Sequence, residues 1–184
     1  CAALKSSLIT RVICSTDNHN IAEVAKSYGA EVPFLRPLEL ATSDAPKLAV
    51  IEHLLNFIES NGQSVSRIVD LDPTSPLREI KDIEDCLDLL DDDSDVVITA
   101  YEADKNPYFN MVEMQPNGNI RLVKPLKGGV VARQHAPSVY SMNASIYVWH
   151  RRSFNKGLWE GETRLHIMPI ERSIDIDAPI DFKL

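Results

Sequence analysis

The chain has 184 residues, of which 44% are hydrophobic and 25% are charged, a composition typical of one globular domain with a sizeable core. Its formal net charge of −8 argues against a broad nucleic-acid-binding surface. No apolar run approaches the ~20 residues that a membrane-spanning helix requires, and no signal peptide is visible. Cys1, Cys14 and Cys86 lack any metal-binding spacing, which favours reduced thiols in a cytoplasmic protein.

Strands and helices are predicted to alternate through most of the chain. Short apolar runs predict buried strands, and apolar residues that recur at helical spacing predict helices. Asn18 or Asn20 is expected to cap the first helix, and Gly29 is expected to end it. The predicted elements are a strand at 11–15, helices at 21–29, 47–60 and 80–90, and further strands at 67–72, 95–101 and 144–150.

A β-hairpin is predicted over residues 110–123, because Asn117-Gly118 favours a two-residue turn. The alternating order with a later hairpin indicates an α/β fold: one domain over residues 1–184 with a mostly parallel, doubly wound sheet. The hairpin belongs to a β-rich insertion that we expect over approximately residues 104–142.

Polar stretches follow several of the predicted strands. In open α/β sheets, ligands bind in the crevice beyond the carboxyl ends of the strands. The three stretches are Ser-Thr-Asp-Asn at 15–18, Asp-Pro-Thr-Ser-Pro-Leu-Arg at 72–78 and Asp-Ile-Asp at 175–177. The first is also typical of a turn with a helix cap, and the second of a turn stiffened by proline.

Asp175 and Asp177 are separated by one residue, Ile176. In an extended strand both carboxylates would point to one face, while Ile174 and Ile176 would point to the core. Two like charges at such spacing repel each other unless a cation lies between them. Hard carboxylate oxygens suit Mg²⁺, which shares its other positions with water and substrate phosphates. A solvated strand end is the alternative.

Three arginines in segments predicted to be loops could bind phosphates. They are Arg36, Arg78 and Arg133. A guanidinium can bind phosphate or carboxylate through two hydrogen bonds, although a surface position is the alternative for each arginine. The five histidines have no i, i+4 spacing, and no serine lies in a G-x-S-x-G context. A histidine metal site and a serine hydrolase are therefore not expected.

Several segments together resemble, in chain order, the acylneuraminate cytidylyltransferases, also called CMP-N-acetylneuraminate synthetases. The resemblance runs from Ala2 to Asp181. It implies a nucleotide-binding α/β fold and the transfer of CMP from CTP to the anomeric hydroxyl of a sialic acid or related nonulosonic acid, with Mg²⁺ and release of pyrophosphate. It also implies a homodimer whose insertion helps to complete the partner's sugar site, and a role in lipopolysaccharide or capsule synthesis. The segments lie at 15–18, 21–32, 36–46, 71–78, 133–148 and 173–177.

The resemblance also implies roles for individual residues. Asp175 and Asp177 match metal-binding, catalytic aspartates. Arg133 matches an arginine expected near the carboxylate of the sugar acid. Core packing is the alternative for Tyr147, a candidate wall of the sugar pocket. Positions matched near the nucleotide are Arg36, Ser43 and Asp44; those matched at the sugar are Asp72, Arg133, Gln134, Asn143, Tyr147, Leu158 and Trp159, the last two from the dimer mate.

Three features depart from this family. Its members open with a strand and a basic, glycine-containing loop that cradles the triphosphate, whereas this chain starts beyond that loop. We expect the loop to be omitted from this sequence rather than lost, because the later motifs are intact. Sialic-acid members often carry Gln at the position of Asp72, and a lysine of some members is replaced by the 106–111 context. The last two departures favour another nonulosonic acid, such as legionaminic acid.

Two other classes of function remain open. A metal-dependent glycosyltransferase also uses a D-x-D pair, but that pair usually lies in the middle of a domain, and here seven residues follow Asp177. A non-catalytic nucleotide-sugar-binding module is the second alternative, and a true lack of the triphosphate loop would favour it.

Overall fold

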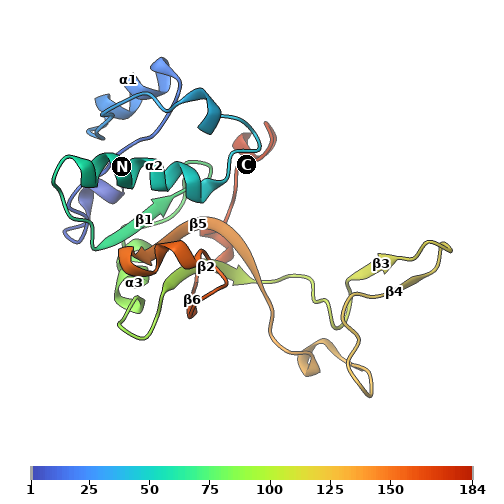
Figure 1. Ribbon diagram of the computed structural model, residues 1–184. Coiled ribbons are helices and arrows are strands. Elements are labelled where there is room, and N and C mark those ends of the chain that lie inside the picture. The colour runs from blue at the N-terminus through green and yellow to red at the C-terminus, as the bar shows by residue number, and fades with distance from the viewer. Residues whose placement is uncertain (1, 184) are drawn as a thin grey trace.

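The computed structural model describes residues 2–183, which form an α/β fold around a four-stranded sheet (Figure 1). A separate two-stranded hairpin projects away from the sheet. The sheet order is β1 (Arg67–Leu71), β5 (Tyr140–His150), β2 (Val96–Glu102) and β6 (Thr163–Ile167); the hairpin is β3 (Val112–Met114) and β4 (Ile120–Leu122); the α-helices are α1 (His19–Ser27), α2 (Lys47–Ser60) and α3 (Ile80–Leu89).

The predicted α/β class is confirmed, but the sheet is mixed. Strand β5 pairs antiparallel with both β1 and β2, whereas β2 and β6 are parallel. Strands β1, β2 and β6 therefore share one direction. The reversal of β5 has a topological cause: the chain leaves the end of β2, forms the projecting segment and returns directly. A parallel return would require a crossover to the opposite end of the sheet.

Two further strand predictions need correction. The segment predicted as a strand at 11–15 forms a single parallel bridge, between Ile13 and Glu31. The last strand of the chain is β6 and not β5. Strand β6 was missed because its sequence, Thr-Arg-Leu-His-Ile, lacks the continuous apolar run that predicted the other strands.

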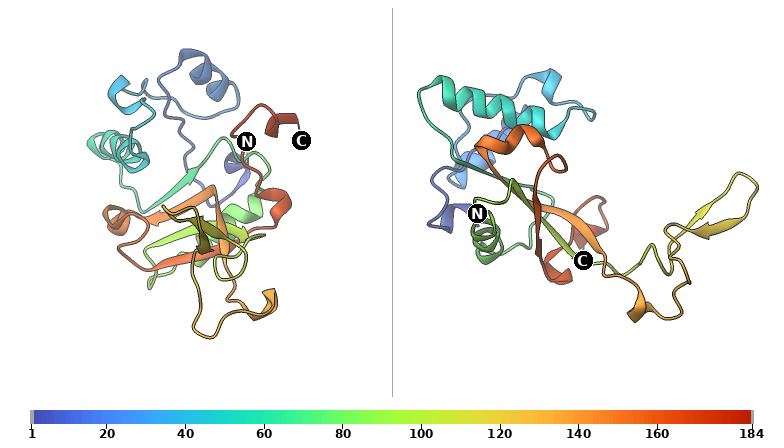
Figure 2. Two further views of the ribbon diagram at one scale, coloured as in Figure 1. Left: turned by 90° about the vertical axis from the view of Figure 1, so that its right-hand side faces the viewer. Right: turned by 60° about the horizontal axis from the view of Figure 1, so that its bottom comes forward.

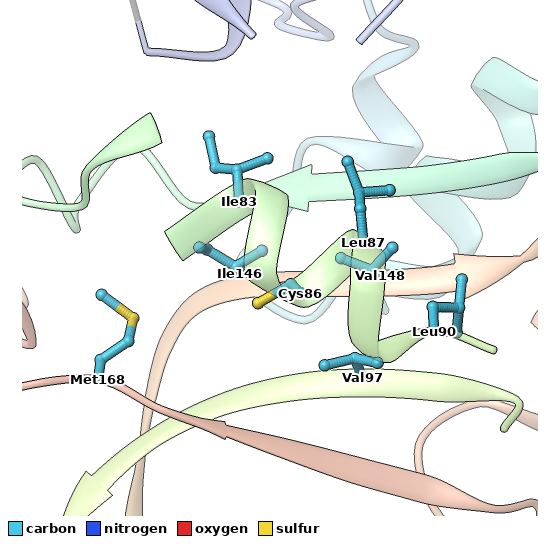
Figure 3. Close-up of a cluster of buried hydrophobic side chains, with 8 residues drawn as sticks. All are labelled: Ile83, Cys86, Leu87, Leu90, Val97, Ile146, Val148 and Met168. Carbon is cyan, nitrogen blue, oxygen red and sulfur yellow. The ribbon is translucent and has the colours of Figure 1, made fainter. Parts of the chain in front are cut away.

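Helices cover both faces of the sheet. On one face α3 packs against Val97, Ile146 and Val148 (Figure 3). On the other face α2 and a 3₁₀ turn (Arg151–Lys156) pack against a cluster that includes Trp149. Successive strand residues point to opposite faces, so these alternating apolar residues fill two separate cores.

The predicted helix boundaries are largely confirmed. Asn18 caps α1, since its Oδ1 accepts hydrogen bonds from the backbone N–H groups of Asn20 and Ile21. Within residues 2–183, no helix is long and apolar enough to cross a membrane. Cys14 and Cys86 are free thiols, and Cys1 lies outside the described residues.

The predicted hairpin is confirmed and lies in the segment that projects from the sheet (Figures 1 and 2). Its turn contains Asn117 and Gly118 but is longer than the two residues expected, because the N–H of Gln115 donates to the carbonyl of Asn119 (2.8 Å). Gly118 adopts a φ of 82°, a conformation that glycine tolerates without strain. The projecting segment leaves the sheet after β2 and returns as β5, so its base lies between two neighbouring strands.

Candidate functional site

Two segments that are distant in sequence meet beyond the carboxyl end of β1. The backbone N–H of Ile176 donates to the carbonyl of Thr74 (2.9 Å), which fixes the Asp-Ile-Asp segment against the 72–78 loop. The loop is itself anchored to β5, because the fully buried Ser75 donates to the carbonyl of Asn143 (3.3 Å). The arrangement places polar residues of both segments together beyond the carboxyl end of β1, which is the crevice position of open α/β sheets, where ligands bind.

The strand expected at Ile174–Asp177 is absent, and the segment has an irregular conformation. Ile174 is 37% exposed, so it does not point into the core as predicted. The segment follows a 3₁₀ turn (Ile170–Arg172) and leads into a turn in which Asp181 accepts hydrogen bonds from the N–H groups of Asp177 and Ala178. These tight turns on both sides prevent the continuous ladder that a strand requires.

The two aspartates differ in their surroundings. Asp175 is partly buried, and its Oδ1 is a buried atom that accepts no hydrogen bond within residues 2–183. Asp177 is exposed. The described residues contain no group of three or more His, Cys, Asp or Glu side chains arranged to hold a metal ion. Any metal at this position would thus need ligands from the substrate or water in addition to these carboxylates.

A lysine holds two further carboxylates together at the end of β1. Lys47 Nζ lies 2.8 Å from Asp70 Oδ2 and 2.9 Å from Asp72 Oδ2. Burial alone would lower the pKa of Lys47, but the hydrogen bonds and charges of the two aspartates outweigh it and raise that pKa. Lys47 therefore stays protonated and compensates the negative charge of the pair.

The aromatic ring of Tyr147 lies beneath the ammonium group of Lys47. Lys47 Nζ lies 4.4 Å from the centroid of the Tyr147 ring, and the ring stacks on Trp149 at 5.7 Å. Tyr147 is 8% exposed, so the alternative of core packing is correct for its ring. Burial raises the pKa of Tyr147, and the charge of Asp175 contributes to the same shift. The hydroxyl thus stays protonated close to Asp175.

Arg78 supplies a second positive charge beside the same crevice. Its Nη1 donates to the carbonyl of Ser145 (3.1 Å), and burial lowers its pKa while the charges of Asp72 and Asp70 oppose that shift. Arg78 remains charged at neutral pH because a guanidinium is so basic. The end of β1 therefore combines acidic groups with two cations.

The position of the Asp-Ile-Asp segment also depends on buried polar residues. Asn143 accepts a hydrogen bond from Thr99 Oγ1 (2.7 Å) and donates one to Ser173 Oγ (3.0 Å). The preceding Arg172 forms two hydrogen bonds, of 3.0 and 2.7 Å, with the 1% exposed Asp82 of α3. The contacts of Asn143 are internal, and its predicted role at the sugar stays a prediction.

The residues predicted at the nucleotide lie on the neighbouring loops. Arg36 donates to the carbonyls of Ser15 and Leu40, and its Nε is buried without a hydrogen-bond partner among residues 2–183. It therefore lies against the 15–18 stretch, and its Nε–H remains without an acceptor there. Ser43 and Asp44 are exposed in the loop that leads into α2.

Four predicted sugar-site residues lie away from this crevice in the single chain. Arg133 and Gln134 are exposed in a 3₁₀ turn of the projecting segment, and Arg133 donates to the carbonyl of Ala103 (3.3 Å). Figure 1 shows this turn well apart from the C-terminal segment. Leu158 packs against the core beside α2, whereas Trp159 is 70% exposed.

Comparisons with known proteins show the family to which this chain belongs. A family model described as cytidylyltransferase matches residues 1–172. The chain belongs to the cytidylyltransferase family. It is 39% identical over 186 residues to a CMP-N,N'-diacetyllegionaminic acid synthase of Campylobacter jejuni, covering 99% of this chain and 78% of the relative.

Two further relatives are similar over almost the full chain, and one solved structure is similar in fold alone. A post-translational flagellin modification protein B of Campylobacter coli is 36% identical (99% of this chain, 78% of the relative). A CMP-N,N'-diacetyllegionaminic acid synthase of Legionella pneumophila is 31% identical (100% and 79%). The fold of this cytidylyltransferase is similar to that of 4-diphosphocytidyl-2C-methyl-D-erythritol synthase from Anaerococcus prevotii, with a TM-score of 0.59 at 10% identity (93% and 76%).

Sequence reasoning did not assign Lys47 or Asp70 to the site of this cytidylyltransferase. A signal for both was present. Asp70 and Asp72 have the same i, i+2 spacing as Asp175 and Asp177, so they share a face at the end of a predicted strand. Lys47 is the first residue of a helix, where a positive charge is unfavourable for the helix itself and thus calls for another explanation.

Proposed function

We propose that this cytidylyltransferase transfers CMP from CTP to the anomeric hydroxyl of a nonulosonic acid, releasing pyrophosphate, and that its preferred acceptor is N,N'-diacetyllegionaminic acid. The observation that carries this proposal is the similarity over almost the full chain to two proteins named CMP-N,N'-diacetyllegionaminic acid synthase, at 39% and 31% identity. The departures at Asp72 and at residues 106–111 favour the same acceptor over N-acetylneuraminic acid.

The residues of the crevice fit a bound Mg²⁺. Asp175 Oδ1 is buried without a hydrogen-bond partner in the described chain, and a buried ionised oxygen is unfavourable unless a positive group compensates it. Asp175 and Asp177 would hold the ion through hard oxygen ligands. When bound, Mg²⁺ would neutralise charge on the triphosphate and make the attacking hydroxyl easier to deprotonate.

The chain's own residues would position both substrates. Arg36 offers an unpaired Nε–H to the nucleotide beside the 15–18 stretch. Ile176 and Thr74 hold the aspartates at the crevice through their backbone hydrogen bond, so that the reacting groups meet in a defined geometry. Arg133 would bind the carboxylate of the sugar acid, for which a planar guanidinium is well suited.

We further propose that the active form is a homodimer. On one face of the hairpin, Val112 pairs with Leu122 and Met114 pairs with Ile120, and three of these four side chains are more than half exposed. A two-stranded hairpin is marginally stable by itself in water, and such an apolar face is stabilised when another surface covers it. A second copy would cover this face and could bring Trp159 to the partner's sugar site.

The experiment that tests the proposed function uses the purified full-length protein with CTP, Mg²⁺ and a panel of acids. The panel contains N,N'-diacetyllegionaminic, N-acetylneuraminic and pseudaminic acid, and product is detected as CMP-sugar and pyrophosphate. We expect the highest kcat/KM with the diacetyllegionaminic acid. Transfer of sugar from a nucleotide sugar, without CMP-sugar formation from CTP, would contradict the proposal and indicate a glycosyltransferase. Binding of CMP-sugar without turnover would indicate a non-catalytic module.

A further inference from the structure

Lys47 occupies a position that does not favour its own helix. It is the first residue of α2, and the first turn of α2 contains no acidic residue and receives no side-chain cap from Pro46. The N-terminus of a helix carries a partial positive charge, so a cation there destabilises the helix. The contacts that favour this lysine are therefore those it makes outside α2.

All of those contacts lie in the crevice. Lys47 Nζ is within 2.9 Å of one oxygen of Asp70 and one oxygen of Asp72, and it covers the ring of Tyr147 at 4.4 Å. Its side chain is 43% exposed, so Lys47 lies at the surface of this site and is not a core residue. The pairing of Asp70 with Tyr147 across β1 and β5 fixes these groups on one face of the sheet.

Asp72 leaves one of its carboxylate oxygens for a ligand. Within residues 2–183, the side chain of Asp72 forms a hydrogen bond with Lys47 through Oδ2 and none through Oδ1, and 27% of that side chain is exposed. A carboxylate accepts hydrogen bonds and does not donate them when it is ionised. The position thus recognises a substrate group that donates an N–H or O–H.

We propose that Lys47 determines specificity at the sugar site. Lys47 holds Asp72 in place and compensates its charge, so that Asp72 accepts a hydrogen bond from an acetamido N–H of a diacetylated nonulosonic acid. This inference rests on the proposed function. An N,N'-diacetylated sugar has two amide donors, whereas an N-acetylneuraminic acid has one. A carboxylate that is already compensated by Lys47 can face a neutral amide, because it does not depend on a substrate cation for its charge balance.

Removing Lys47 would change Asp72, the proposed hydrogen-bond acceptor, in two ways. Asp70 and Asp72 would then keep only the charge of Arg78 as compensation, and like charges at this spacing repel. Asp72 would also lose the hydrogen bond that fixes its orientation. The acetamido contact would weaken, while contacts with the nucleotide on the neighbouring loops would be kept.

The test compares Lys47→Met, which keeps the length and removes the charge, with Lys47→Arg, which keeps the charge. Lys81→Met is the matched control, because Lys81 pairs with Asp85 on α3 across the sheet. For Lys47→Met we expect kcat/KM with N,N'-diacetyllegionaminic acid to fall about 10-fold or more, mainly through KM, as for a lost charged contact. The KM for CTP and the kcat/KM with N-acetylneuraminic acid should change by less than about threefold, which is the size of effect expected from the loss of an exposed ion pair.

The outcomes separate this inference from the proposed function. Lys47→Arg should restore most of the preference, and Lys81→Met should behave as the wild type. An equal loss with both sugars and with CTP, accompanied by a lower melting temperature, would show a structural ion pair and overturn the inference. If Lys47→Met does not fold, Lys47→Gln is measured against the same criteria. A wild-type chain that makes no CMP-sugar from any acid would overturn the proposed function, and the inference with it.

Discussion

The Asp175 carboxylate combines burial, negative neighbours and an unused oxygen. Its Oδ1 accepts no hydrogen bond within residues 2–183, and its charge contributes to the raised pKa of Tyr147. Asp70 and Asp72 add to the same shift, while Lys47 opposes it. Lys47 is already shared by those two aspartates, and no cation among residues 2–183 forms an ion pair with Asp175. This imbalance is what an Mg²⁺ ion would correct.

Replacing either aspartate of the pair should therefore slow turnover. We expect Asp177→Asn to lower kcat by about 100-fold or more, because it removes a charged ligand from the centre where charge develops. Asp175→Asn should also impair turnover. Rates are measured at saturating CTP and sugar across an Mg²⁺ titration. Asp181→Asn is the control, since an amide oxygen can still accept the two backbone hydrogen bonds of that turn. Wild-type rates in both variants at limiting Mg²⁺ would contradict the metal assignment.

Arg133 is exposed, and the hydrogen bond it donates to a backbone carbonyl leaves much of its guanidinium free. If it binds the sugar carboxylate, Arg133→Ala should raise the KM for sugar about 10-fold or more, as for a lost charged pair at an interface. The KM for CTP should change much less. Arg133→Lys should rescue in part, because it keeps the charge without the planar fork. Weaker CTP binding with unchanged sugar kinetics would assign Arg133 to the triphosphate instead.

At the scale of elements, the segment that carries the aspartates is tied to α3 through Asp82. This carboxylate is 1% exposed and accepts hydrogen bonds from Arg172 and from the backbone of Glu79. The segment has no strand ladder to hold it, so the ion pair and the Asn143–Ser173 bond carry its position. A substitution that breaks the ion pair between Arg172 and Asp82 should consequently weaken both the stability of the fold and the binding of the metal.

Arg172→Met should lower the free energy of unfolding, because it removes both arginine hydrogen bonds of the 1% exposed Asp82 and leaves that carboxylate with the Glu79 N–H and with His166 Nε2 at 3.6 Å. It should also raise the Mg²⁺ concentration needed for half-maximal activity. The free energy of unfolding is measured by urea unfolding, and the Mg²⁺ requirement is measured by titrating activity with Mg²⁺. Arg121→Gln is the control, since its ion pair with Glu113 is exposed and should contribute little. Unchanged stability in Arg172→Met would exclude this ion pair as the anchor.

The same ion pair makes stability depend on pH. Burial alone would raise the pKa of Asp82, but its hydrogen bonds with Arg172 and the Glu79 backbone outweigh burial and lower that pKa below 3.8. This stabilisation of the folded protein is therefore fully present at pH values above the ordinary pKa of an aspartate, and it is lost as the pH falls through the lowered pKa of Asp82. Asp82→Asn should be less stable near neutrality and should show a flatter loss on acidification. Urea unfolding between about pH 7 and about pH 3 measures this, and parallel pH profiles for the two proteins would contradict it.

At the scale of the whole molecule, the projecting hairpin is the feature that a single copy leaves uncovered (Figure 2). We expect sedimentation at micromolar concentration to show a dimer. The double variant Met114→Glu, Ile120→Lys places charges on the apolar face and should shift the protein to monomer with loss of activity. Glu113→Gln, on the opposite face, should leave the dimer intact. A wild-type monomer with full activity would refute the assembly.

Local patterns in the sequence were sufficient for the helices, the caps and the hairpin. Asn18 caps α1 through its own side chain, and Asn117-Gly118 forms the hairpin turn with residues next to it in sequence. These features depend on contacts within a few residues, so composition and spacing determine them. The apolar runs at 95–101 and 144–150 likewise predicted strands, which the structure contains as β2 and as part of β5.

The tertiary structure alone decided the direction of β5, the presence of β6 and the surroundings of the aspartates. β6 lacks a strong apolar pattern and is held in the sheet by its pairing with β2. The Asp-Ile-Asp spacing suggested a strand, but turns on both sides and one backbone bond from Ile176 to Thr74 set its conformation. Lys47 reaches Asp70 and Asp72 only after α2 packs on the sheet. Such contacts join residues far apart in sequence, and their geometry depends on packing that no local pattern encodes.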